Sequence, residues 1–304
     1  MITIFFGLKK GIEKIMKIMP NALCWCGSKQ KYKRCHMNYD SIIKMKKKEG
    51  FVIPKKKWIK NGIQIEGIRE SGKINTAILD YITDKIYIGM PTEEIDRLIY
   101  EKTKELGGIP APLGYEGYPK SVCTSINDVV CHGIPSERDV LCDGDIINVD
   151  VSTVYKGYFS DSSRTFLLGN VKPEVEKLVR VTKECIELGL EEVAPWETFG
   201  KMSSAIDKHA QKHGYSVVRE IGGHGVGLEF HEEPWIGYTD GFGEMLLMTP
   251  GMIFTIEPMI NMGDGEIYVD EEDGWTVYTS DGQPSAQWEI MVLVTETGYE
   301  VLAW

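Results

Sequence analysis

Two aspartates at the ends of one apolar stretch are the first residues whose types and spacing indicate chemistry. Residues 148–161, NVDVSTVYKGYFSD, contain Asp150 and Asp161, eleven positions apart. On one straight strand an odd separation places two side chains on opposite faces. If the stretch folds into a hairpin about Tyr155 and Lys156, the two carboxylates become directly opposed, with Cβ atoms ~4.5–5.5 Å apart. Carboxylates that close need a proton, a cationic side chain or a metal between them; the alternative is that both only flank strand ends in solvent.

Three later segments carry metal-ligand residue types in unusual settings. GGHGVG places His224 between glycines, TIEPM places Glu257 in an apolar run, and AQWEIMVLV places Glu289 at the start of a β-branched run. Each alone is more often a core or rim residue, but a buried carboxylate is costly unless it is paired or bound to metal. With Asp150 and Asp161 they make four carboxylates and one imidazole, a donor set that suits Mn, Fe, Co or Zn. Two divalent cations would balance four negative charges, so the set predicts a dinuclear metal centre.

The elements that must position these ligands follow one order twice along the chain. The patterns predict a helix over about 65–83 and a second one capped by Thr92 and stopped by Gly107, followed by strands over 121–168. A third helix is expected from Pro173 and a fourth up to Gly214, again followed by strands. This order indicates a weak internal duplication and an α+β domain.

A cysteine and histidine cluster precedes the globular part of the sequence. The segment CWCGSKQKYKRCH supplies four soft ligands within thirteen residues, Cys24, Cys26, Cys35 and His36. Such spacing predicts a tetrahedral structural zinc site, and a segment with so few apolar residues should fold only with zinc. The alternative is that these are reactive thiols in loops.

Charge divides the chain into a basic start and an acidic body. The net charge of the 304 residues is −11, but residues 1–60 carry 16 Lys/Arg against three acidic residues, or +13, and the remainder carries −24. The basic part would suit a polyanion such as nucleic acid and the body cationic ligands; the alternative is a solvated tail without a partner. We expect an N-terminal extension over 1–40, a basic linker over 41–63 and a catalytic domain over 64–304. Residues 1–18 would form an amphipathic helix or precede the native start.

Cysteine usage and hydropathy narrow the cellular setting. Seven cysteines at uneven spacing do not fit a secreted disulfide framework and favour a reducing cytosol. No apolar run approaches the ~20 residues of a membrane span.

His209 and His213 lie at i, i+4, but the HExxH pattern is absent, so we expect these two histidines to lie on a helix surface.

The motifs CHGIP, NVDV…YFSDSSRTF, GGHGVG, FHEEP, TIEPM and AQWE, in this order from about residue 64 to 304, resemble type I methionine aminopeptidases. The resemblance implies a pseudo-twofold pita-bread fold of the creatinase/aminopeptidase type. It also implies removal of N-terminal methionine, with preference for small second residues, by hydroxide that two divalent metal ions (Co, Mn, Fe or Zn) activate. The cysteine cluster resembles the SEC-C motif, C-x-C-x8-C-[CH], which some bacterial members carry at their start.

Carried over residue by residue, this resemblance implies a role for each position. Asp150 would hold one metal, Asp161 and Glu289 would bridge both, and His224 and Glu257 would complete the other. Glu257 would also shuttle a proton, and two histidines would approach the substrate and help stabilise the oxyanion: His132 and His231. The pocket for the methionine side chain would be lined by Tyr115, Tyr118, Cys123, Phe230 and Trp275.

The implied protein is a cytoplasmic monomer that acts on nascent polypeptide N-termini and docks at the ribosome through its basic start. Three alternatives remain open. One is a proline-directed peptidase of the same fold, although residues 1–63 are too short for the usual N-terminal domain of that group. Another is a non-catalytic binding protein on this fold, and the third is an RNA- or ribosome-binding module that carries the peptidase body as a passenger.

Overall fold

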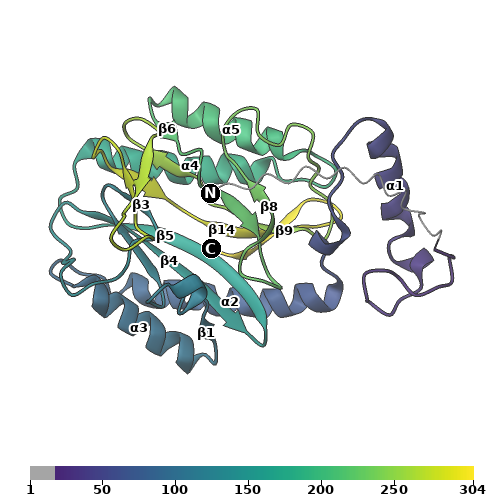
Figure 1. The fold of residues 1–304 in the computed structure, drawn as a ribbon, viewed down its shortest axis with the longest axis horizontal. Coiled ribbons are helices and arrows are strands. Elements are labelled where there is room, and N and C mark those ends of the chain that lie inside the picture. The colour runs from purple at the N-terminus through teal and green to yellow at the C-terminus, as the bar shows by residue number, and fades with distance from the viewer. Residues whose placement is uncertain (1–17) are drawn as a thin grey trace.

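The computed structural model describes residues 18–304, and after residue 61 these form two halves with helices outside and strands inside (Figure 1). Figure 1 shows α2 and α3 along one side of the strands and α4 and α5 along the other. The α-helices are α1 (Met37–Lys48), α2 (Gly62–Thr83), α3 (Thr92–Glu105), α4 (Pro173–Glu191) and α5 (Phe199–Lys212). The short 3-10 helices are η1 (Tyr32–Arg34), η2 (Lys56–Trp58) and η3 (Tyr115–Gly117).

The strands form four antiparallel sheets in the described residues. The first half contributes β1 (Ile109–Pro110), β2 (Cys123–Ile126), β3 (Val129–Cys131), β4 (Ile146–Tyr155) and β5 (Tyr158–Leu167). The second half contributes β6 (Ser216–Val217), β7 (Gly223–Gly225), β8 (Glu232–Ile236), β9 (Ile253–Ile256), β10 (Met259–Asn261), β11 (Ile267–Val269), β12 (Val277–Thr279), β13 (Ser285–Gln287), β14 (Ile290–Val294) and β15 (Tyr299–Ala303). The strand orders are β1-β4-β2 with β5 beside β4, β13-β10-β6, β11-β12-β3 and β15-β14-β9-β7-β8. The predicted order of two helices followed by strands is therefore present in both halves.

The hairpin of β4 and β5 turns one residue later than the sequence analysis placed it. Tyr155 pairs with Tyr158, so the two turn residues are Lys156 and Gly157. Both have positive φ, 50° and 83°, as the type I′ turn requires. Gly157 accepts this conformation without steric cost, which explains why the turn includes it.

The shift changes which residues of β4 and β5 face each other. Asp150 pairs with Ser163, and Asp161 pairs with Ser152. The prediction that the two aspartates are directly opposed is therefore wrong. They are diagonal neighbours and still share one face of the hairpin, because residues two apart on a strand point the same way.

Helix boundaries agree with the predicted signals except at one cap. Pro173 is the first residue of α4, and Gly107 and Gly214 follow α3 and α5 with φ of 78° and 83°. Thr92, however, lies inside α3 rather than capping it. Its hydroxyl accepts a hydrogen bond from the Ser136 amide (2.8 Å) and donates one to the Ser136 carbonyl (3.1 Å), so it fastens the helix start to a loop.

Two apolar layers hold the helices against the strands and leave the inner faces for polar groups. On β4, Val149 and Val151 are buried in the cluster formed with α2 and α3. Asp150 and Ser152 alternate with them and point to the other face. A larger cluster joins α4 and α5 to the strands of the second half, including Leu178, Ile206, Phe254 and Ile256. The alternation thus turns the carboxylates toward the space between the halves.

The N-terminal extension lies against the body rather than apart from it. The hydroxyl groups of Tyr39 on α1 and Thr249 lie 3.0 Å apart, and Val52 forms a bridge to Leu246. Helix α1 spans the expected boundary at residue 40, so the division into 1–40, 41–63 and 64–304 stays a prediction. The amphipathic helix expected at the start falls on residues 1–17, outside the described part. No helix within residues 18–304 combines the length and apolar composition needed to cross a membrane.

Candidate active site

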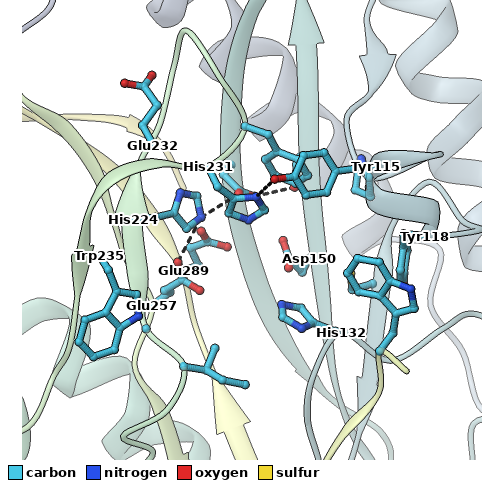
Figure 2. Close-up of a pocket in the computed structure, with 18 of the residues that line it drawn as sticks. Tyr115, Tyr118, His132, Asp150, His224, His231, Glu232, Trp235, Glu257 and Glu289 are labelled. Carbon is cyan, nitrogen blue, oxygen red and sulfur yellow. Dashed lines mark hydrogen bonds and ion pairs between the residues drawn. The ribbon is translucent and has the colours of Figure 1, made fainter. Parts of the chain in front are cut away.

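The five expected metal ligands come from both halves and meet between them (Figure 2). Asp150 lies on β4, Asp161 on β5 and His224 on β7, while Glu257 directly follows β9 and Glu289 directly precedes β14. The Nε2 atom of His224 lies 3.7 Å from the Asp161 carboxylate and 3.6 Å from that of Glu257. Backbone hydrogen bonds between Ser163 and Glu289 (3.2 and 3.3 Å) join β5 to the second half beside these ligands.

The carboxylates are shielded from water and have no cationic partner. Asp161, Glu257 and Glu289 are buried, and one oxygen each of Asp150 and Glu289 is buried without a hydrogen-bond partner. No Lys or Arg is among the described residues that line the cavity. Removal from solvent raises the pKa of Asp150 to about 7 and that of Glu257 to about 8, and it raises the pKa values of Asp161 and Glu289 well above their usual range. Bound cations would offset this cost, so the donor set fits divalent metal ions.

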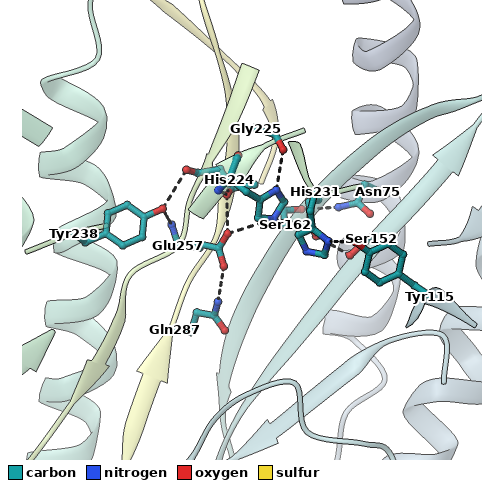
Figure 3. A network of polar contacts seen from close by, with 12 residues as sticks. Asn75, Tyr115, Ser152, Ser162, His224, Gly225, His231, Tyr238, Glu257 and Gln287 are labelled. Atoms are coloured by element: carbon teal, nitrogen blue, oxygen red, sulfur yellow. Dashed lines mark hydrogen bonds and ion pairs between the residues drawn. The ribbon is translucent and has the colours of Figure 1, made fainter. Parts of the chain in front are cut away.

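Hydrogen bonds from neighbouring residues orient the ligands (Figure 3). Ser152 donates to Asp161 (2.7 Å), Thr255 donates to Glu257 (2.6 Å), and the Gln287 amide donates to the other Glu257 oxygen (3.3 Å). None of these three residues is predicted from the sequence to be functional. A signal was present for Thr255, which stands two residues before Glu257 and therefore projects to the same side of the strand.

The tautomer of His224 is set by its own strand. Its Nδ1 lies 2.9 Å from the Gly225 carbonyl, which accepts a hydrogen bond from the protonated ring nitrogen. This leaves Nε2 unprotonated and directed at the carboxylates. Burial lowers the pKa of His224 to about 3, so the ring is neutral near pH 7, as a metal ligand must be.

Two further histidines face the same space. Burial, with a smaller contribution from His231, lowers the pKa of His132 to about 4. His231 packs against His224 with ring centroids 4.3 Å apart, and its Nδ1 lies 3.0 Å from the Tyr115 hydroxyl. Figure 2 shows His132 and His231 on either side of Asp150. Both rings therefore lie where a group held near the carboxylates would contact them.

An aromatic-walled cavity of about 470 Å³ adjoins the ligands. Tyr118 packs edge-on against Trp275 (5.2 Å between ring centroids), and Tyr115 packs against Phe230 (4.9 Å). All of the expected substrate residues line this cavity, namely Tyr115, Tyr118, Cys123, His132, Phe230, His231 and Trp275. Several other lining residues are not predicted from the sequence, among them Glu220, Ile221 and Trp235. They belong to no periodic pattern or ligand motif, so only the folded chain could reveal them.

The four residues of the cysteine cluster converge in a second candidate metal site. The Sγ atoms of Cys26 and Cys35 lie 3.5 Å apart, and His36 Nδ1 lies 3.3 Å from Cys24 Sγ and 3.1 Å from Cys35 Sγ. These separations suit the edges of a small tetrahedron around zinc. Burial raises the pKa of Cys35 to about 12, so this thiol stays protonated unless a cation displaces the proton.

A third cluster, Glu184, His209 and His213, has a simpler explanation. Glu184 on α4 lies 2.8 Å from the His209 ring on α5, and its other oxygen accepts a hydrogen bond from Arg180 (2.6 Å). The prediction of helix surface needs correction for His209, whose side chain is only 16% exposed. This histidine fastens the two helices together, and the Arg180 charge already neutralises Glu184.

Comparison with known proteins identifies two regions of the chain. Residues 66–296 match the model of metallopeptidase family M24, and residues 21–38 match the SEC-C motif. The chain is 48% identical to methionine aminopeptidase A of Synechocystis sp., over 79% of this chain and 94% of that protein. It is 40% identical to the methionine aminopeptidase of Chlamydia pneumoniae over 93% of this chain and 97% of that protein.

Solved structures with the same architecture include a methionine aminopeptidase from Rickettsia prowazekii. The two chains are 40% identical, with a TM-score of 0.79 over 81% of this chain and 99% of the other. A prolidase from Pyrococcus furiosus, at 22% identity and a TM-score of 0.64, shares the fold over 87% of this chain. These likenesses confirm the predicted α+β pita-bread fold.

Proposed function

The chain belongs to metallopeptidase family M24, and from that membership we propose that it removes N-terminal methionine from nascent proteins and peptides. The observation that carries the proposal is the aromatic cavity directly beside the shielded carboxylates. Aromatic walls contact an unbranched thioether well. The cavity therefore suits a methionine side chain whose α-amine and first peptide bond lie at the carboxylates.

Two divalent metal ions would be held by Asp150, Asp161, His224, Glu257 and Glu289, with Co, Mn, Fe and Zn as candidates. When bound, such a pair supplies an activated water nucleophile and polarises the scissile carbonyl. The four carboxylates of this set balance two such cations. One oxygen each of Asp150 and Glu289 is buried without a hydrogen-bond partner, so these two atoms gain most from a bound cation.

The chain's own residues would position the substrate and move one proton. His132 and His231 lie beside the ligands as neutral rings and would donate to the developing oxyanion. The Tyr115 hydroxyl fixes the orientation of His231 (3.0 Å). Glu257 is the candidate for passing a proton to the leaving amine, since Thr255 and Gln287 hold both of its oxygens in place.

Selectivity would follow from the shape of the cavity. Tyr115, Phe230 and His231 pack together at one wall, with Tyr115 4.9 Å from Phe230 and 5.1 Å from His231 between ring centroids. Crowding beside the scissile bond would favour small second residues. The free amine of the substrate would bind near the carboxylates, which limits cleavage to the first residue.

A peptide series tests this proposal. Met-Ala-Ser, Met-Gly and Met-Ser peptides should lose methionine, with little action on Met-Lys or Met-Trp, when each metal is restored in turn under anaerobic conditions. Metal content per chain would separate an enzyme from a non-catalytic binding protein. Faster hydrolysis of Ala-Pro or Leu-Pro peptides would overturn the assignment in favour of a proline-directed peptidase.

The setting proposed for this enzyme is the cytoplasm, as a monomer that docks at the ribosome. All seven cysteines are free thiols, which is compatible with a reducing compartment. Lys29, Lys31, Lys33 and Arg34 are all exposed on the loop that carries the cysteine cluster. A structural zinc held by Cys24, Cys26, Cys35 and His36 would fix this loop and present the four charges together.

A further inference from the structure

A lysine between the N-terminal extension and the catalytic body is almost completely shielded from water. The side chain of Lys60 is 1% exposed, and its Nζ lies 2.7 Å from a Glu232 oxygen and 3.5 Å from the Trp58 carbonyl. Burial lowers the pKa of Lys60, and the Glu232 charge opposes that change. Lysine is rarely buried so deeply without a charged partner, and Glu232 is the carboxylate that compensates the charge of Lys60.

Glu232 uses its other oxygen to close the loop that carries two residues of the candidate active site. Its Oε1 accepts hydrogen bonds from the backbone amides of Leu228 (2.8 Å) and Glu229 (3.3 Å). Phe230 and His231 lie between these amides and Glu232 in the chain. In Figure 2 the Glu232 carboxylate points away from the metal ligands, while His231 points toward them. Glu232 lines the outer part of the same cavity, but its carboxylate shapes the loop rather than facing the metal ligands.

The residue after Lys60 connects the same segment to the cysteine cluster. The Asn61 side chain donates a hydrogen bond to the Cys26 carbonyl (2.8 Å). Its oxygen accepts from the Ile63 and Gln64 amides and so caps α2. The Lys60 amide donates to the Gly251 carbonyl (2.8 Å), which fastens this segment to the body. Residues 60–61 thus form one continuous link from Cys26 to loop 228–232.

We propose that Lys60 is a positioning residue for the substrate-contacting pair Phe230 and His231, and that zinc in the cysteine cluster steadies it through Asn61. The inference rests on the proposed function. The neighbouring ion pairs do not explain the link, because Lys55, Lys57 and Glu233 are all at least half exposed. Exposed pairs of this kind contribute little to stability. The buried pair holds the loop because either partner alone would be a shielded, uncompensated charge.

The first test compares Lys60→Met with Lys60→Arg and with Lys57→Met as the matched exposed control. Backbone hydrogen exchange of residues 228–232 should become at least about tenfold faster in Lys60→Met, remain near the parent rate in Lys60→Arg, and stay unchanged in Lys57→Met. For Met-Ala-Ser, kcat/KM should fall by at least about tenfold in Lys60→Met, with unchanged metal content at the carboxylates. Parent-like exchange and turnover in Lys60→Met would overturn the proposal.

A second variant covers the case in which Lys60→Met does not fold. The double variant Lys60→Met/Glu232→Gln leaves no unpaired charge and keeps an oxygen for the Leu228 amide. It should fold, and its loop should still exchange faster than the parent loop. The exchange readout does not depend on turnover. Failure of the parent to cleave any Met peptide would overturn the proposed function alone, while a parent-like loop in the double variant would overturn the role of Lys60 alone.

The zinc link needs a double-mutant cycle. Asn61→Asp keeps the oxygen that caps α2 but loses the donor to Cys26, and Cys35→Ser removes one ligand of the cysteine cluster. With zinc bound to the parent, Cys35→Ser should speed exchange of loop 228–232 several-fold, and it should have no further effect in the Asn61→Asp background. Equal effects of Cys35→Ser in both backgrounds, or no effect in either, would refute transmission through Asn61.

Discussion

At the scale of single residues, the site is defined by oxygen atoms that the protein does not satisfy. One oxygen each of Asp150 and Glu289 is shielded without a hydrogen-bond partner, whereas polar neighbours hold Asp161 and Glu257. A buried polar atom left alone is destabilising, so such atoms mark the place where a ligand completes the structure. Two such oxygens on carboxylates of one cavity, with no Lys or Arg among the described residues that line it, distinguish this site from an ordinary polar core.

A substitution of Asp150 tests whether the unsatisfied carboxylate oxygens bind metal. Asp150→Asn should lower the metal content of the catalytic domain and reduce kcat/KM for Met-Ala-Ser by ~10²–10⁴-fold, because an amide removes one negative charge from the donor set. Circular dichroism should show a folded chain. Asp84→Asn, at an exposed position after α2, is the matched control and should keep full metal content and turnover. Normal turnover by Asp150→Asn would contradict the role of Asp150 as a metal ligand.

Glu257 carries a second role that a different substitution isolates. Glu257→Ala should abolish cleavage without unfolding the chain, because it removes both a proposed metal ligand and the carboxylate that Thr255 and Gln287 orient for proton transfer. General acid–base groups typically account for ~10²–10⁴-fold in rate. Single-turnover kinetics with metal content measured on the same sample would separate lost ligation from lost proton transfer. Parent-like kcat in Glu257→Ala would rule out both roles.

At the scale of elements, short strands and close backbone contacts set where the ligands point. Gly223 begins β7 beside His224, and a Cβ there would lie 2.1 Å from the Tyr238 hydroxyl and 2.7 Å from the Thr255 carbonyl. The glycines that flank His224 in GGHGVG permit such close approach, because they carry no side chain. The structure identifies the approaching groups, which come from β9 and from a residue after β8.

Gly223→Ala should therefore displace β7 and loosen the metal site. Overpacking of this kind costs ~1–3 kcal/mol, which thermal or urea unfolding would measure. Metal affinity should fall as well, because His224 moves with its strand. Gly298→Ala is the control, since a Cβ at Gly298 meets nothing within 4 Å. Equal stability of the two variants would show that β7 adapts freely.

The sequence predicted the types of elements better than their register. Periodicity and end signals located α2, α4 and the hairpin, because Pro173 and the turn glycines act through local backbone preferences. The turn at Lys156 and Gly157 was placed one residue early, and a shift that small decides whether Asp150 faces Asp161 or Ser163. The roles of Lys60 and Gln287 could not be predicted from the sequence, because their partners are distant along the chain. Lys60 contacts Glu232, 172 positions away, and Gln287 contacts Glu257, 30 positions away.

At the scale of the whole molecule, the shielded carboxylates make stability depend on pH in a characteristic direction. Their pKa values in the folded chain are raised, to about 7 for Asp150 and about 8 for Glu257, so the metal-free folded chain binds more protons than the unfolded chain. The free energy of unfolding then falls as pH rises through these values. The site histidines titrate lower when folded and oppose this trend only below about pH 6.5.

Thermal unfolding without metal should accordingly show a midpoint that decreases from about pH 6.5 to about pH 8.5. Added Mn²⁺ should raise the midpoint most at the upper end, because the ionised carboxylates bind the cation. Asp150→Asn without metal should show a shallower slope. A midpoint that rises with pH in the metal-free parent would contradict the assigned direction of the carboxylate pKa shifts.

The chain begins with a basic segment and continues as an acidic body, and this asymmetry predicts how it binds ribosomes. Residues 1–60 carry +13 and the remainder −24, so a polyanion should attract the start of the chain and repel the body. Lys/Arg contacts to phosphates release counterions, and binding to ribosomes should weaken steeply as salt increases. We expect a variant in which Lys29, Lys31, Lys33 and Arg34 are all changed to Gln to co-sediment with ribosomes less than the parent at low salt. Turnover of Met-Ala-Ser should stay unchanged, since the cavity includes none of these positions.

Two controls make the sedimentation experiment decisive. Lys44→Gln/Lys48→Gln removes charge from α1 but leaves the cysteine loop intact, and it should sediment more like the parent than the four-residue variant does. Cys35→Ser should lose binding together with zinc if the metal presents the loop, even though its charge is unchanged at the four positions. Equal sedimentation of the parent and the four-residue variant across the salt range would eliminate docking through this loop. A protein partner of the zinc motif would then be the next candidate, because the loop would still expose four cationic side chains on a fixed scaffold.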